Sequence, residues 1–122
     1  MATPVDPSEV LTRFVIYNRW FKKSGRFNAF MPYMDETSVF RTTSISVDDI
    51  WDIGDREVAP QRGKPILGRA DIGALNVKSN DLQVTPNEPP VNHAVITGWP
   101  DEESKQKEIA LELASTADFF ER

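Results

Sequence analysis

The chain has 122 residues, of which 39% are hydrophobic and 27% charged, and its formal net charge at pH 7 is −5. This length and balance indicate one globular domain and argue against a disordered chain. The sequence has no cysteine, which excludes disulfides, zinc–thiolate sites, iron–sulfur clusters and a cysteine nucleophile. The negative charge also disfavours generic DNA binding, which needs a basic surface.

Residues 1–10 contain two prolines and several small residues, and they predict a loose lead-in to a globular domain of residues 11–122. The lead-in has neither the basic nor the apolar region of a signal peptide. No run approaches the ~18 apolar residues of a membrane helix. We therefore expect a cytoplasmic protein without membrane association.

The first half of the chain predicts two strands followed by a helix. Residues 11–17 are rich in β-branched and aromatic side chains, and residues 36–44 have the composition of a second strand. Ser46 is a typical helix N-cap, and acidic residues follow it where they suit the helix dipole. The expected helix covers residues 46–54 and ends at Gly54.

The second half predicts further strands and a longer helix. Residues 66–77 are compatible with either a short strand or a single helical turn. Residues 81–86 and 93–98 predict two more strands. Residues 100–115 begin with acidic side chains and then place apolar residues at helical spacing, which predicts an amphipathic helix. The tail, residues 118–122, is expected to fold back onto the body.

These elements predict an α+β fold. Four to five short strands form a small single domain together with the helices at 46–54 and 100–115. Turns and loops, and not regular crossover helices, follow most of the strands. A mixed or mostly antiparallel sheet is therefore expected.

The strongest functional feature is a basic and aromatic run inside residues 11–34, a segment without any acidic residue. Aromatic residues and arginine are enriched where proteins dock on one another. We therefore predict a protein-interaction module, an accessory or regulatory subunit that binds a protein partner through this run. The expected partner-binding residues are Arg19, Trp20, Phe21, Lys22, Lys23, Arg26 and Phe27.

Other interpretations of the same run stay open. Basic side chains contact phosphates and aromatic rings stack on bases, so residues 19–27 also allow a nucleic-acid-binding domain. The run would equally suit a hydrophobic core element with solvated lysines. Residues 101–122 carry seven acidic and three basic residues. Opposite charge at the two ends would permit head-to-tail self-association, or complementarity within one fold.

His93 is the only histidine and lies at the start of a predicted strand. Histidine can act as a general base or serve as a structural hydrogen-bonding group. Arg41 and Asp71 are polar residues of other predicted elements, and one hypothesis is that they converge on it. A small enzyme using His93 with Arg41 or Asp71 is thus a further hypothesis. The enzyme hypothesis is not the favoured hypothesis, because the sequence has no phosphate-binding loop, dinucleotide fingerprint or nucleophile elbow. We expect no metal or cofactor.

Overall fold

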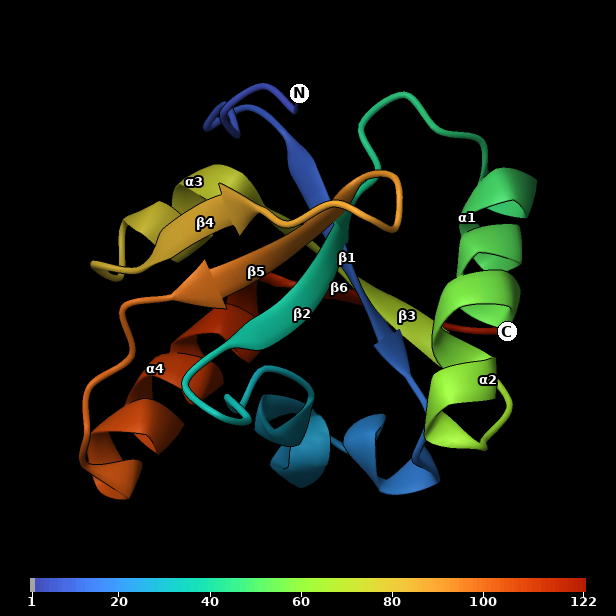
Figure 1. Cartoon of the computed structure of the whole chain (residues 1–122). Coiled ribbons are helices and arrows are strands. Elements are labelled where there is room, and N and C mark those ends of the chain that lie inside the picture. Colours follow the sequence, from blue (N-terminus) through green and yellow to red (C-terminus); the bar gives the residue numbers. More distant parts are fainter. Residues whose placement is uncertain (1) are drawn as a thin grey trace.

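The structure, a computed structural model, describes residues 2–122, which form a six-stranded antiparallel sheet in the order β4-β5-β2-β1-β3-β6 (Figure 1). This confirms the predicted α+β fold with an antiparallel sheet. The sheet has more strands than the four to five predicted, because the tail pairs as an edge strand. The strands are β1 (Val10–Val15), β2 (Thr37–Arg41), β3 (Gly68–Gly73), β4 (Gln83–Pro86), β5 (His93–Thr97) and β6 (Asp118–Glu121).

Helical segments cover both faces of the sheet, with α1 and α2 on one side and α3 and α4 on the other (Figure 1). Across residues 2–122, no helix has both the length and the apolar character needed to cross a bilayer. The segments are two 3₁₀ helices, η1 (Asn18–Trp20) and η2 (Lys23–Ala29), then α1 (Val47–Ile53), the π-helical turn η3 (Gly54–Val58), α2 (Ala59–Arg62), α3 (Ala74–Lys78) and α4 (Glu103–Thr116).

Strand alternation divides the core into two clusters. On one face, Leu11 of β1 and Leu113 of α4 belong to the larger cluster, which α3, α4 and the 3₁₀ helices close. On the other face, Phe14 of β1 packs with Phe40 of β2 and with Ile53 of α1. Because β1 contributes to both clusters, it lies at the centre of the packing as well as of the sheet.

The helix that follows β2 does not end at Gly54, contrary to the prediction. Ser46 does cap it, since its Oγ accepts a hydrogen bond from the Asp49 amide at 3.2 Å. Gly54 has helical dihedrals, and a Cβ there would lie 2.7 Å from the ring of Phe14. Glycine is thus required for close packing and not for a stop. Gly63, with φ of 63°, is the glycine that ends α2.

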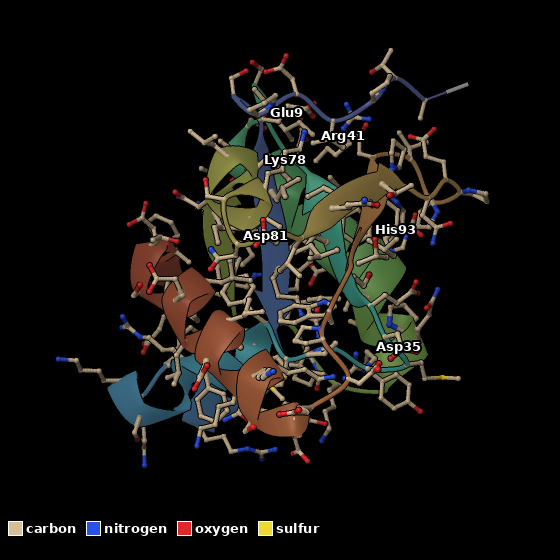
Figure 2. The ribbon with its side chains drawn as sticks, turned by 90° about the vertical axis from the view of Figure 1, so that its left-hand side faces the viewer. Glu9, Asp35, Arg41, Lys78, Asp81 and His93 are labelled. Atoms are coloured by element: carbon tan, nitrogen blue, oxygen red, sulfur yellow. The ribbon has the colours of Figure 1, made fainter. Side chains whose placement is uncertain are left out.

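Residues 2–10, which we expected to be loose, are attached to the body. Val5 is only 5% exposed and belongs to the larger core cluster. Lys78 Nζ donates to the Val5 carbonyl at 2.6 Å, and Arg41 Nη1 donates to the Thr3 carbonyl at 2.6 Å. Figure 2 shows Lys78 and Arg41 together with Glu9 at this end of the molecule. One apolar anchor and two cations therefore fix the segment.

The two central strands, β1 and β2, are paired over only part of their length, which leaves a split between them. β1 pairs with β3 along its whole length, but with β2 only at Leu11↔Arg41 and Thr12↔Phe40. Continuing this register would place Ser38 opposite Phe14. The carbonyl of Ser38 instead accepts a hydrogen bond from the Arg13 side chain. The split between β1 and β2 borders the cleft described next.

Candidate functional site

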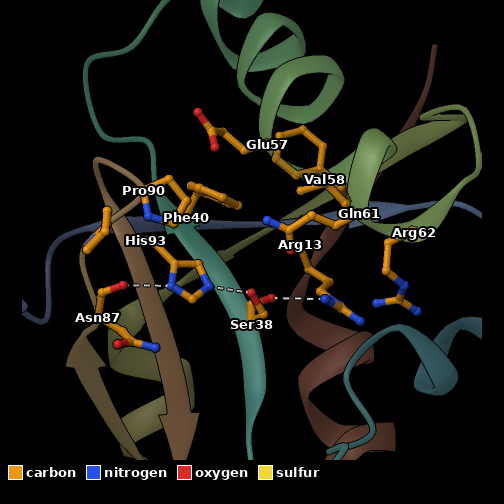
Figure 3. A pocket seen from close by; sticks show the side chains of 12 residues that line it. Arg13, Ser38, Phe40, Glu57, Val58, Gln61, Arg62, Asn87, Pro90 and His93 are labelled. Carbon is orange, nitrogen blue, oxygen red and sulfur yellow. Dashed lines mark hydrogen bonds between the residues drawn. The ribbon is translucent and has the colours of Figure 1, made fainter.

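A cleft of about 340 Å³ opens beside the split, on the side of the sheet that carries α2 (Figure 3). β1, β2 and β5 contribute one side of it. The turn η3, helix α2 and the loop before β5 contribute the rest. Its polar lining includes Arg13, Ser38, Glu57, Gln61, Arg62 and His93. The volume is near the lower end of the range for small-molecule sites.

Ser38 and His93 form a hydrogen-bonded pair across β2 and β5. The register Phe40↔His93 places Ser38, Phe40 and His93 on one face of the sheet. Ser38 Oγ lies 2.5 Å from His93 Nε2, and His93 Nδ1 lies 2.8 Å from the carbonyl oxygen of Asn87. The ring of Phe40 meets the imidazole edge-on at 5.2 Å between centroids. These three contacts fix both the position and the plane of the imidazole.

The contact with Asn87 determines how a neutral His93 carries its proton. A carbonyl oxygen can only accept, so Nδ1 is the protonated nitrogen and Nε2 has the free lone pair. Nε2 therefore accepts the hydrogen bond from the Ser38 hydroxyl. A serine whose hydroxyl donates to an oriented imidazole is the arrangement that general-base activation of a nucleophile requires. Here the orienting group is a backbone carbonyl and carries no full negative charge.

Arg13 is the unusual cation of the cleft. Its Nε donates to the Ala29 carbonyl at 2.8 Å and its Nη1 to the Ser38 carbonyl at 3.1 Å. Burial, with a smaller contribution from the charge of Arg62, lowers the pKa of Arg13 to about 10. The cleft also contains Glu57, whose carboxylate lies 3.2 Å from Arg56 Nε. Two arginines and one glutamate therefore give the cleft a positive character.

The structure does not bring His93 together with Arg41 or Asp71. Arg41 follows Phe40, so its side chain lies on the opposite face of the sheet, where it holds Glu9 at 2.7 and 2.8 Å (Figure 2). Asp71 shares a face with His93, but β2 and β1 lie between them. Its carboxylate bonds Arg69 at 3.2 Å and the Thr12 hydroxyl at 2.7 Å. In residues 2–122, no three histidine or acidic residues gather where they could hold a metal ion.

The basic and aromatic run is divided between core and surface. Trp20 is 6% exposed and belongs to the larger core cluster, against which Phe21 and Phe27 pack. Arg26 is half-buried, with its guanidinium 4.9 Å from the ring centroid of Phe119. The members that remain exposed are Arg19, Lys22 and Lys23. The aromatic residues expected to contact a partner thus serve mainly to hold η1 and η2 on the body.

Sequence reasoning missed Ser38 and Arg13 as residues of the site. Arg13 could have been recognised from the sequence, because it places a charge inside the apolar predicted strand of residues 11–17. Ser38 had no comparable signal, because its contact with His93 depends on how two distant strands pair. Relatives give no guidance on either position, since no family model, curated protein or solved structure matches the chain.

Proposed function

We propose that the protein is a small hydrolytic enzyme in which Ser38 attacks an ester carbonyl and His93 acts as the general base. One observation carries this proposal: the Ser38 Oγ–His93 Nε2 contact of 2.5 Å inside the cleft, with the tautomer fixed by the Asn87 carbonyl. His93 was already the candidate of the enzyme hypothesis. Ser38 replaces Arg41 and Asp71 as the residue with which it acts.

The proposed reaction conserves protons and needs no further reactant than water. Ser38 Oγ bonds to the ester carbonyl carbon while its proton moves to His93 Nε2. The carbon–oxygen bond to the alcohol then breaks, and the alcohol leaves with the proton from His93. Water, deprotonated in turn by His93, releases the acid from Ser38 and regenerates the hydroxyl. The volume of the cleft favours small esters over polymers.

Hydrolysis of p-nitrophenyl acetate tests the proposal. We expect Ser38→Ala and His93→Gln each to lower kcat/KM at least about 100-fold, the usual contribution of acid–base catalysis. Ser115→Ala, which removes an exposed hydroxyl of α4, is the matched control. A fluorophosphonate should label Ser38, as located by peptide mass spectrometry. If Ser38→Ala folds and keeps the wild-type rate, the pair is a structural hydrogen bond and the proposal fails.

As a second proposal, the protein docks on a protein partner. The surface available for docking is smaller than the one that the sequence predicted. Three cations of the run remain exposed and available to a partner. We also propose that the protein is located in the cytoplasm, where it would meet such a partner. Cell fractionation would test this location. The docking surface consists of Arg19, Lys22 and Lys23.

A pull-down with and without nuclease tests this docking surface. Wild type is compared with the double variant Lys22→Glu/Lys23→Glu and with the matched control Arg56→Glu/Lys105→Glu, which reverses two exposed charges on η3 and α4. A protein captured by wild type and the control, but lost in the first variant, supports docking. Capture that nuclease abolishes indicates nucleic acid instead, and capture of the same chain indicates self-association.

A further inference from the structure

Arg13 differs from Arg41 and Arg69 in having no acidic partner. Arg41 pairs with Glu9 at 2.7 Å, and Arg69 pairs with Asp71 at 3.2 Å. Within residues 2–122, no carboxylate lies at ion-pair distance from Arg13. Its two hydrogen bonds go to neutral carbonyl oxygens, which satisfy donors without neutralising the charge. A cation held in this way favours an anion from outside the chain.

The guanidinium of Arg13 has donors that no protein oxygen uses and that are accessible. A guanidinium has five N–H donors, and the bonds to the two carbonyls leave Nη2 without a partner in the part of the chain that the structure describes. No enclosed side-chain nitrogen or oxygen among those residues lacks a hydrogen bond. Nη2 is therefore not enclosed. Its accessible surface belongs to the two adjoining hollows that Arg13 lines, the cleft and the hollow next to Trp20.

Arg62 at the end of α2 supplies a second positive charge to the same place. Figure 3 shows both guanidinium groups beyond Ser38 as seen from His93. Both side chains also line a neighbouring hollow next to Trp20 and Tyr33. Their like charges disfavour one another, as the effect of Arg62 on the pKa of Arg13 shows. An oxyanion between them would remove this repulsion and accept charge-assisted hydrogen bonds.

We infer that Arg13 and Arg62 form a subsite for an oxyanion, a carboxylate or a phosphate, carried by the small ester that Ser38 attacks. The identity of the ester rests on the proposed hydrolytic function, whereas binding of the anion does not. Arg13 bonds the main-chain oxygen of residue 38, so the oxyanion lies close to the nucleophile. The substrate is then a short ester whose acid part ends in a negative charge.

Binding is tested without turnover, by calorimetric titration with inorganic phosphate and with adipate. We expect both anions to bind, and more weakly as salt increases. Arg62→Gln should weaken binding at least about tenfold, because it removes a charge-assisted donor from the subsite. Lys64→Gln, two residues away, is the control for a general loss of positive charge. Absence of binding by both anions, or equal weakening in the two variants, overturns the subsite.

Substrate choice is tested with two esters of equal chain length, p-nitrophenyl hexanoate and mono-p-nitrophenyl adipate, which differ in a terminal carboxylate. Wild type should prefer the adipate ester, and Arg62→Gln should lower the ratio of the two kcat/KM values about tenfold. The ratio should stay unchanged in Lys64→Gln. Hydrolysis of both esters without preference overturns the subsite and leaves Ser38 as nucleophile. Anion binding without hydrolysis keeps the subsite and removes the hydrolytic function.

Discussion

At the scale of single residues, three arginines show that surroundings decide the role of a side chain. Arg41 pairs with Glu9 and fixes the start of the chain. Arg69 lies over the rings of Trp51 and Phe120, at 4.8 and 4.4 Å from their centroids, and so joins α1 to β6. Arg13 bonds two carbonyls and faces the cleft. Of these three, Arg13 alone has no acidic partner.

The pair of Glu9 and Arg41 makes stability depend on pH. Hydrogen bonds from Arg41 lower the pKa of Glu9 in the folded state. The pKa of Glu9 is therefore lower in the folded chain than in the unfolded chain. The pair stabilises the fold fully at pH values above the pKa of the unfolded chain, and this stabilisation is lost as the pH falls through the pKa of the folded chain. Glu9→Gln should reduce the free energy of unfolding by about 2 kcal/mol at pH 7 and by less below about pH 4.

Urea titrations at pH 7 and pH 3 measure this difference for Glu9→Gln. The exposed Glu112→Gln is the control and should change little at either pH. A deficit for Glu9→Gln that is equally large at both pH values would contradict the explanation. The side chain would then matter for its packing alone.

The buried position of Trp20 gives a second prediction at this scale. Trp20→Ala should lower the free energy of unfolding by about 3–5 kcal/mol, as for large aromatic residues removed from a core. Its exposed neighbour Arg19→Ala should stay within about 0.5 kcal/mol. Urea titration followed by circular dichroism measures both. Near-wild-type stability of Trp20→Ala would show that this ring is not part of the core.

At the scale of elements, the helix from α1 to α2 depends on one close contact with β1. Gly54→Ala would normally favour a helix by about 1 kcal/mol. The added methyl would lie 2.7 Å from the ring of Phe14 and 3.2 Å from Ile66, so overpacking of about 1–3 kcal/mol should exceed that gain. We therefore expect a lower melting temperature for Gly54→Ala.

A double variant separates this contact from other effects of the alanine. Phe14→Leu makes room beside residue 54, so Gly54→Ala should cost less stability in that background than in wild type. The two single variants and the double variant complete the cycle, measured by thermal unfolding. A melting temperature raised by Gly54→Ala alone would contradict the close contact.

The turn η3 within this helix has a physical reason that sequence patterns did not reveal. Pro60 lacks an N–H, and its ring interferes with the carbonyl four residues earlier. The Ala59 amide instead bonds the carbonyl of Gly54, five residues earlier, which widens the helix just before the proline. The wider turn contains Glu57 and Val58, which line the cleft. The proline and the shape of the cleft are therefore connected.

Elements determined by local patterns could be predicted from the sequence, and those determined by pairing could not. The N-cap at Ser46 and the long C-terminal helix follow from adjacent residues. Residues 66–77 stayed ambiguous because they form both β3 and α3, one directly after the other. The same limit applies to the site. His93 could be identified by type, whereas its contact with Ser38 depends on the register of β2 against β5.

At the scale of the whole molecule, two core clusters share the central strands, so the fold should unfold as one unit. Leu113 is fully buried in the larger cluster and Ile53 is buried in the smaller. Leu113→Ala and Ile53→Ala should each lower stability by about 2–5 kcal/mol and shift one common transition. Fluorescence and circular dichroism should report the same midpoint for each variant. Separate midpoints for Ile53→Ala would show that the clusters unfold independently.

The two segments of opposite charge lie against one another in the fold. The acidic helix α4 packs against η2, which belongs to the basic run. Lys107 of α4 lies with its Nζ 4.9 Å from the ring centroid of Phe27. Contacts between these two segments thus include an interaction of a cation with an aromatic ring. Within residues 2–122, no ion pair joins an acidic side chain of 101–122 to a basic side chain of the run, so complementarity within one molecule and head-to-tail self-association both stay open.

The split between β1 and β2 has a consequence for amide hydrogen exchange. The carbonyl of Val10 bonds the Thr42 amide, and backbone groups alternate along a strand, so the Phe14 amide also faces β2. The ladder ends at Thr12. Exchange should therefore be faster at Phe14 than at Thr12, although central strands usually exchange slowest. A compound that fills the cleft would slow exchange at Phe14. The Phe14 amide would therefore report ligand binding in a screen, without any assumption about the reaction.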